Sequence, residues 1–179
     1  MTQLAQSTDL NATDLAANFF QQSTGIWRSE RRYYTLPEGK TQEMVSRLTV
    51  RFLIQGCAEL VKLAEKHNME DLRALRCGSE VTWESHDSIS GHRQSRGSTV
   101  FGVLGQSLYR DRGFATPKPV IAEYYLSDPN TLCLRTEYND SVFEEEIKHI
   151  GQKYRTRQSI ISRAGEQQMI GQYLEKRLD

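Results

Sequence analysis

The sequence predicts a mainly β fold in which about ten antiparallel strands close into an up-and-down barrel. Short runs of alternating apolar and polar residues follow one another from residue 26 to residue 174, and a period of two is typical of strands with one buried face. The connections are short and rich in Gly, Pro, Asn and Asp, which favours hairpins. A chain of 179 residues can bury one such core, and closure removes the exposed sheet edges.

Residues 1–10 are expected to form a disordered leader, and residues 11–179 a single barrel domain. After Asn11, a candidate helix cap, four apolar residues fall on one side of a short helix that ends near Gly25; they are Leu15, Ala16, Phe19 and Phe20. The leader has neither the basic nor the apolar stretch of a secretory signal. No apolar run approaches the roughly 20 residues that span a bilayer. We therefore expect a soluble, cytoplasmic protein without membrane insertion.

Residues 26–36 and 41–53 are predicted to form a hairpin around Pro37 and Gly39. In residues 57–68 the period becomes helical, which indicates one amphipathic helix after the second strand. Its apolar face consists of Cys57, Leu60, Val61 and Ala64. Eight further strands are expected at residues 79–84, 98–104, 107–110, 120–126, 131–138, 141–150, 153–162 and 168–174.

Two arginines stand two residues apart in one predicted strand. Because residues i and i+2 share a strand face, Arg155 and Arg157 should point the same way, together with Ser159. On a solvent face they would be a solvated basic stripe, whereas inside a closed barrel they need an anion. Basic and acidic residues balance at 23 each, so no overall field attracts nucleic acid and anion recognition has to be local.

Other chemistries lack support in the sequence. No GxGxxG, GxxxxGK[ST] or GxSxG motif is present, which argues against nucleotide binding and α/β-hydrolase chemistry. The odd number of cysteines and the scattered histidines argue against a disulfide framework and predict no metal site. The cysteines, expected to act as small hydrophobic residues, are Cys57, Cys77 and Cys133.

The predicted first helix leads into Gly25-Ile26-Trp27. This entry resembles the Gly-x-Trp motif of lipocalins, in which the tryptophan packs across the closed end of the barrel. The resemblance implies a lipocalin-like, or calycin-like, barrel with a ligand-holding lumen. Trp27 is then expected to serve barrel closure.

Six motifs follow in order along the chain: Trp27-x-Ser29-x-Arg31, Val81-Thr82-Trp83, Gly97-Ser98-Thr99-Val100, Thr136-Glu137-Tyr138, Glu144-Glu145 and Arg155-x-Arg157-x-Ser159. Together, from about Phe19 to Leu178, they resemble the S/U-type phycobiliprotein lyases, the CpcS/CpeS family. Members are ten-stranded lipocalin-like barrels of cyanobacteria and related algae that bind an open-chain tetrapyrrole, or bilin, and attach it to a phycobiliprotein cysteine. The resemblance implies a lyase that forms a carbon–sulfur bond during phycobilisome biogenesis. Its substrate would be phycocyanobilin or a close relative, and it would need no prosthetic group.

Parts of the sequence differ from the catalytic pattern. Many catalytic members carry a His-His pair shortly after the tryptophan, where this chain has Arg32-Tyr33-Tyr34-Thr35. These differences resemble the U-type branch, some of whose members are the partner subunit of an S-type protein. Two alternatives therefore stay open: a non-catalytic partner subunit of an S-type lyase, and a lipocalin-like carrier of a carboxylated apolar ligand.

A bilin presents two propionates, four pyrrole-type nitrogens and a long conjugated skeleton. The resemblance implies that Arg155 and Arg157 bind the propionates, with Arg31 as a further candidate, because the guanidinium fork matches a carboxylate. Carboxylates beside the nitrogens would hold the pyrroles protonated, and the catalytic candidates are Glu137, Glu144 and Glu145. Salt bridges to Arg135 or Lys148 are the alternative reading of these glutamates.

Further bilin-binding candidates are Trp83, Tyr34, Tyr138 and Ser159. Aromatic side chains among them would supply apolar area and stacking geometry for the tetrapyrrole. The implied partners are a free bilin, an apo-phycobiliprotein subunit, and a second lyase chain that makes a homodimer or a heterodimer with an S-type protein.

Overall fold

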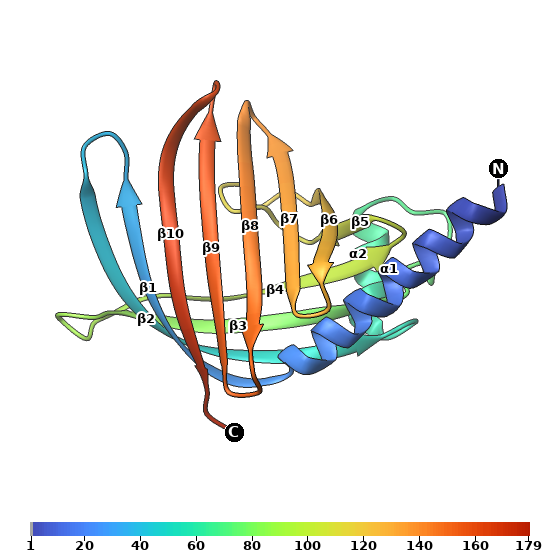
Figure 1. Ribbon diagram of the computed structural model, residues 1–179, viewed down its shortest axis with the longest axis horizontal. Coiled ribbons are helices and arrows are strands. Elements are labelled where there is room, and N and C mark those ends of the chain that lie inside the picture. Colours follow the sequence, from blue (N-terminus) through green and yellow to red (C-terminus); the bar gives the residue numbers. More distant parts are fainter. Residues whose placement is uncertain (1) are drawn as a thin grey trace.

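The computed structural model describes residues 2–179, and Met1 lies outside it. Its ten strands form one closed antiparallel barrel in the ring order β1-β10-β9-β8-β7-β6-β5-β4-β3-β2 (Figure 1). Strands consecutive in the chain are neighbours, and β1 pairs with β10 to close the ring. The predicted mainly β, up-and-down barrel is confirmed.

The strands alternate buried and exposed residues over most of their length, as the sequence pattern predicted. Their bounds are β1 (Gly25–Thr35), β2 (Lys40–Ile54), β3 (Cys77–Asp87), β4 (Arg93–Leu104), β5 (Ser107–Arg110), β6 (Val120–Asp128), β7 (Thr131–Tyr138), β8 (Ser141–Ile150), β9 (Tyr154–Arg163) and β10 (Glu166–Arg177). β3 and β4 extend further than predicted because their cross-strand pairing continues past Glu84 as far as His86 and Arg93.

Two helices accompany the barrel, α1 (Thr2–Ser23) and α2 (Ala58–Lys66). α1 begins before Asn11, inside the segment predicted to be a disordered leader. No glycine or proline interrupts the sequence from Thr2 to Ser23, so no helix breaker forces a start at Asn11. Neither helix of the described chain is long and apolar enough to cross a membrane.

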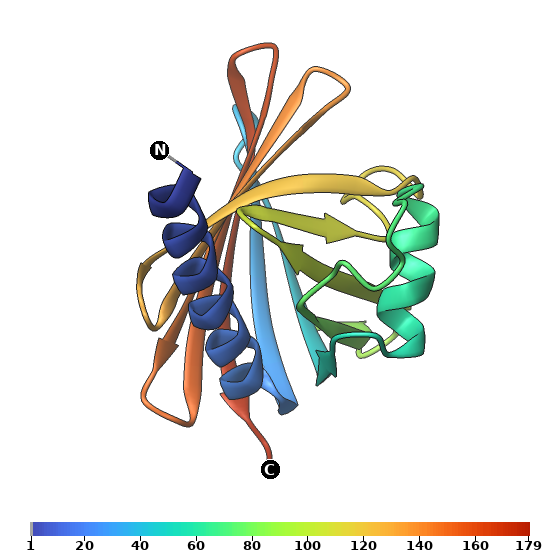
Figure 2. The same cartoon turned by 90° about the vertical axis from the view of Figure 1, so that its right-hand side faces the viewer.

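The two helices lie on different sides of the molecule (Figure 2). α1 brings Ala16, Phe19 and Phe20 into a core cluster with inward residues of the barrel, near the end where the C-terminus lies (Figure 1). α2 is the predicted amphipathic helix, and its buried Leu60 and Leu63 cover the outside of the sheet beside Gly102. One end of the lumen is therefore filled from the N-terminal side of the chain.

Candidate ligand-binding site

The barrel encloses a cavity of about 330 Å³, within the size range of small-molecule sites. Its wall is mostly apolar and aromatic, with Phe19 and Phe20 of α1 at one end. Five arginines line this wall, although basic and acidic residues balance over the whole chain. They are Arg31, Arg110, Arg112, Arg155 and Arg157.

Strand pairing aligns the inward residues of β1, β10, β9 and β8 into three rows, most of whose members are polar. The row nearest α1 runs Ser29, Glu175, Arg155 and His149; the next runs Arg31, Tyr173, Arg157 and Ile147; the third runs Tyr33, Gly171, Ser159 and Glu145. Because inward residues repeat every second position, the Arg-x-Arg-x-Ser spacing on β9 supplies one member to each row. The predicted common face of Arg155, Arg157 and Ser159 is the lumen face.

The first row forms a buried ion pair. Nε of Arg155 donates to Oε2 of Glu175, and the Ser29 hydroxyl donates to Oε1 of the same carboxylate over 3.0 Å. Glu175 is 0% exposed. Burial works to raise the pKa of Glu175, but the charges of Arg155 and Arg157 outweigh burial and hold this pKa below its ordinary value. Arg155 lines the cavity, yet its Nε is already engaged.

Trp27 closes the barrel beside this pair. Its Nε1 donates to the carbonyl oxygen of Ser23 over 2.8 Å. The guanidinium carbons of Arg155 and Arg177 lie 4.6 and 4.3 Å from the centroid of its ring, at cation–π distance. The side chain is 0% exposed and is absent from the cavity wall, so its position fits the predicted structural role.

His149 completes the closed end of the lumen. Its ring centroid lies 4.6 Å from that of Phe19, and Nε2 lies 3.0 Å from the hydroxyl oxygen of Ser23. Burial, together with the charge of Arg155, lowers the pKa of His149 to about 4. The imidazole is therefore neutral near pH 7.

The second row places two arginines on one tyrosine. The guanidinium carbons of Arg31 and Arg157 each lie 5.3 Å from the ring centroid of Tyr173. Burial raises the pKa of Tyr173 to about 12, so the hydroxyl keeps its proton and donates to the Tyr33 hydroxyl at 3.4 Å. Arg31 donates from Nε to Ser29, and no carboxylate among the described residues forms an ion pair with it.

The third row supplies the carboxylate of the cavity. Glu145 is 5% exposed; its Oε1 accepts hydrogen bonds from Nε and Nη2 of Arg157, and its Oε2 lies 3.7 Å from Nη1 of Arg110. Burial works to lower the pKa of Arg157, but the charge of Glu145 reverses the effect and raises it. Burial lowers the pKa of Arg110, with Glu145 opposing.

Aromatic rings form the other walls. The indole of Trp83 lies against Gly97, where a Cβ atom would stand 2.7 Å from Cζ2. Phe143 stacks on Phe114 at 5.3 Å and 12° and on Tyr138 at 4.7 Å and 14°. The Tyr138 hydroxyl accepts a hydrogen bond from the backbone N–H of Ala115 over 2.8 Å, so Tyr138 fixes the β5–β6 connection behind the cavity wall.

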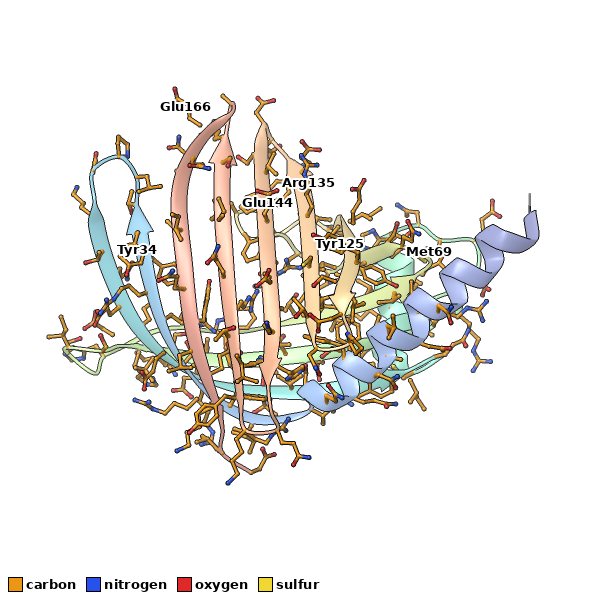
Figure 3. All side chains as sticks on the ribbon, in the orientation of Figure 1. Tyr34, Met69, Tyr125, Arg135, Glu144 and Glu166 are labelled. Carbon is orange, nitrogen blue, oxygen red and sulfur yellow. The ribbon has the colours of Figure 1, made fainter. Side chains whose placement is uncertain are left out.

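The structure brings six of the predicted site residues to the cavity wall: Arg155, Arg157, Arg31, Trp83, Ser159 and Glu145. Tyr34, Glu137 and Glu144 face away from the lumen, as Figure 3 shows for Tyr34 and Glu144. In each case the neighbouring residue along the strand faces inward, namely Tyr33, Thr136 and Glu145, and alternation turns the predicted residue outward. Glu137 instead pairs with Arg135 over 2.9 Å at the surface, in agreement with the alternative reading.

The sequence analysis did not single out several residues of the site, among them Arg110, Arg112, Phe114, Phe143, Tyr173 and Glu175. Alternation offered a signal for Arg110, since it stands two residues after the apolar Leu108 in a predicted strand. Glu175 lies one residue beyond the predicted end of the last strand.

A family model described as CpeS-like protein matches residues 16–178. The chain is 65% identical over 160 residues to a Nostoc sp. protein named "Putative phycocyanobilin lyase CpcS 2", covering 89% of both chains. It is 46% identical over 173 residues to a Picosynechococcus sp. protein named "Putative chromophore lyase CpcV", covering 95% of this chain and 86% of that protein.

Among solved structures, the S-type phycobiliprotein lyase CPES from Guillardia theta superposes with a TM-score of 0.74 at 22% sequence identity. The match covers 90% of this chain and 91% of the other. At this identity the likeness shows a shared fold and no more.

Proposed function

Because this chain belongs to the CpeS-like protein family, we propose that it is a bilin lyase. It binds an open-chain tetrapyrrole and attaches it through a thioether bond to a cysteine of a phycobiliprotein subunit. Phycocyanobilin is the proposed substrate, since a relative with 65% identity carries that substrate in its name. The reaction takes place in the cytoplasm, and the lyase works either as a homodimer or beside an S-type chain.

The excess of cations in the lumen carries this proposal. Five arginines line the cavity, whereas the carboxylates paired with them are Glu145 and Glu175. The buried Arg110 shares Glu145 with Arg157, and the half-buried Arg31 has no carboxylate partner among the described residues. Because a buried charge without a full counterion is costly, the lumen favours an anionic ligand. Apolar and aromatic walls require that the ligand be largely apolar as well. A conjugated tetrapyrrole with two propionates meets both requirements.

Arg157 and Arg31 are the proposed contacts for one propionate. Both lie over Tyr173 in one row, and Arg31 has no carboxylate partner among the described residues. Nε and Nη2 of Arg157 bind Glu145, and Nε of Arg31 binds Ser29, so the propionate would meet the remaining Nη donors of the two guanidiniums. Arg155 acts through Glu175 and Trp27, which it holds in place, and so it positions the closed end of the site.

Glu145 is the proposed catalytic carboxylate. It faces the cavity with its charge partly balanced by Arg157, and beside the pyrrole nitrogens it would hold them protonated. A protonated tetrapyrrole has a more electrophilic ethylidene group on its terminal ring. The acceptor thiol adds across this double bond: sulfur bonds to one carbon, the thiol proton ends on the tetrapyrrole, and nothing leaves. The balance needs no oxidant.

The lyase contributes no nucleophile in this scheme. Burial raises the pKa of the Cys77 thiol to about 11, which leaves almost no thiolate at neutral pH. Cys57 and Cys133 are half-buried and lie outside the cavity wall. The attacking thiol belongs to the acceptor protein, and the lyase acts by positioning the bilin.

Two measurements test the proposal. Mixing the pure protein with phycocyanobilin should shift and sharpen its visible absorption, and Arg157→Gln should weaken the shift while the surface control Arg135→Gln does not. Co-expression with bilin-producing enzymes and an apo-phycobiliprotein subunit, with and without an S-type chain, should give a fluorescent band on a denaturing gel containing zinc.

The outcomes separate the alternatives. Binding without any covalent adduct, even beside an S-type chain, would identify a carrier. An adduct only in the mixed pair would identify a subunit of a heteromeric lyase. An unchanged spectrum at micromolar bilin would reject the function.

A further inference from the structure

Arg110 is a buried cation whose hydrogen-bonding capacity is largely unused. Its side chain is 6% exposed, and among the described residues its Nε has no hydrogen-bond partner. Nη1 lies 3.7 Å from Oε2 of Glu145, which is beyond hydrogen-bond length. The other oxygen of Glu145 is engaged by Arg157. Buried polar groups are normally satisfied, so an Nε left open beside a cavity indicates a ligand.

Two aromatic rings form cation–π contacts with the guanidinium of Arg110. Its central carbon lies 4.9 Å from the ring centroid of Phe101 and 4.6 Å from that of Phe114. Cation–π contacts stabilise the charge through the face of the guanidinium and do not consume its N–H groups. Phe114 is itself fixed by stacking on Phe143. The donor edge of Arg110 is thus held in a set position at the cavity wall.

A second cation of the cavity wall, which forms no ion pair with any described residue, follows two residues later. Arg112 also lines the cavity and lies 6.0 Å from the ring centroid of Trp83. Asp111 stands between the two arginines but turns to β4, where it accepts hydrogen bonds from the Thr99 hydroxyl at 2.8 Å and from the backbone N–H of Val100 at 3.0 Å. Both bonds end on Oδ1, and no hydrogen bond joins Asp111 to either guanidinium among the described residues.

Glu145 lies between Arg110 and Arg157, the arginine proposed to bind the first carboxylate. Arg157 binds its Oε1 and Arg110 approaches its Oε2. The two guanidiniums are therefore separated by a single carboxylate group. They project from different walls, because β5 stands four places around the ring from β9. Two carboxylates on adjacent parts of one ligand could engage both cations at once.

We propose that Arg110 and Arg112 form a second carboxylate-binding site in the lumen, for the second carboxylate of a ligand whose first is held by Arg157 and Arg31. The aromatic surroundings restrict it to carboxylates attached to a flat conjugated body. The proposal rests on the proposed function only for the identity of that ligand as a bilin. It makes the protein selective for dicarboxylates over their esters.

The test compares phycocyanobilin with its dimethyl ester, which has the same skeleton without charge. Binding of both is measured by absorption titration for the wild type and for Arg112→Gln, Arg110→Gln and the control Arg96→Gln. Arg96 is an exposed arginine of β4 that is absent from the cavity wall. Because hydrogen bonds between charged groups contribute about 1.5–3 kcal/mol, removing either arginine should lower the preference for the diacid by roughly tenfold. Ester affinity should stay unchanged.

Arg112 is exposed, so Arg112→Gln gives a result even where Arg110→Gln perturbs folding, which circular dichroism and urea unfolding would detect. Wild-type preference for the diacid in Arg112→Gln, and in any folded Arg110→Gln, would overturn the proposal while leaving bilin binding intact.

A separate probe distinguishes failure of this site from failure of the function. Anilinonaphthalene sulfonate is an aromatic monoanion whose fluorescence reports binding. If the wild type bound neither tetrapyrrole, the proposed function would fail. A several-fold weaker binding of the dye by Arg112→Gln would then still support the anion site, and equal binding by wild type and variant would overturn it.

Discussion

Trp83 lies against Gly97 on the neighbouring strand so closely that a Cβ atom at position 97 would stand 2.7 Å from Cζ2 and 3.1 Å from Cε2 of the indole. Gly97 has no left-handed backbone angle, so its role is one of space. The missing side chain lets the ring stay at the barrel wall, where it forms one side of the cavity.

Replacing Gly97 by alanine is expected to push the indole into the lumen. The overpacking should cost about 1–3 kcal/mol of unfolding free energy and weaken phycocyanobilin binding, because the displaced ring occupies ligand space. Tryptophan fluorescence and absorption titration measure the two effects. Ser98→Ala, one position along on the exposed side of β4, is the matched control; unchanged bilin affinity in Gly97→Ala would contradict the role of Trp83 as a wall.

Glu175→Gln is expected to destabilise the barrel by about 3–5 kcal/mol, because it leaves the buried charge of Arg155 uncompensated. Urea unfolding measures the loss. The double variant Arg155→Met with Glu175→Leu should recover most of it, since neither charge then remains. Glu137→Gln breaks an exposed pair with Arg135 and should have almost no effect. Equal losses in the single and double variants would show that packing matters more than charge.

Acidification should destabilise the protein through His149. Its pKa is about 4 in the folded state and near 6.5 in the unfolded chain, so between these values the unfolded state binds a proton that the folded state does not. The free energy of unfolding therefore falls as the pH falls from 6.5 towards 4, and this contribution is constant above 6.5. His149→Gln should flatten the dependence in that window, whereas the exposed His92→Gln should not. The measurement compares the urea midpoints of unfolding at pH 7 and pH 5 for the wild type and both variants.

Glu144 and Glu145 provide a matched pair on opposite faces of β8. Glu145→Gln should reduce transfer of the bilin to an acceptor by about a hundredfold, the lower end of the range for loss of an acid–base group, and shift the absorption of the bound bilin towards its unprotonated form. Glu144→Gln removes an exposed carboxylate and should match the wild type. Equal transfer by the two variants would remove Glu145 from the mechanism.

The fold was accessible from the sequence because alternation and turn residues act locally. The same pattern placed Arg155, Arg157 and Ser159 on one face correctly. It gave the wrong face where the choice was made by residue type: Tyr34, Glu137 and Glu144 were selected, and they face outward, whereas the selected Glu145 and the unselected Tyr33 face the lumen. A shift of one residue reverses the face of a strand.

Side-chain pairs between strands could not be predicted. Arg155 pairs with Glu175 across the neighbouring strands β9 and β10, and Arg110 on β5 approaches Glu145 on β8, three places around the ring. The first pair depends on the register of the β9–β10 hairpin and the second on the closure of the barrel, and no local pattern specifies either. The length of α1 was also missed, because composition alone does not decide where a helix without breakers begins.

The position of α1 has a consequence for the order of events during transfer. Phe19 and Phe20 occupy one end of the cavity, so α1 blocks entry of a ligand from that end. A ligand that enters from the opposite end with one ring first keeps its last ring nearest the opening. The acceptor protein therefore meets whichever ring entered last, and the direction of loading decides which ring a thiol can reach.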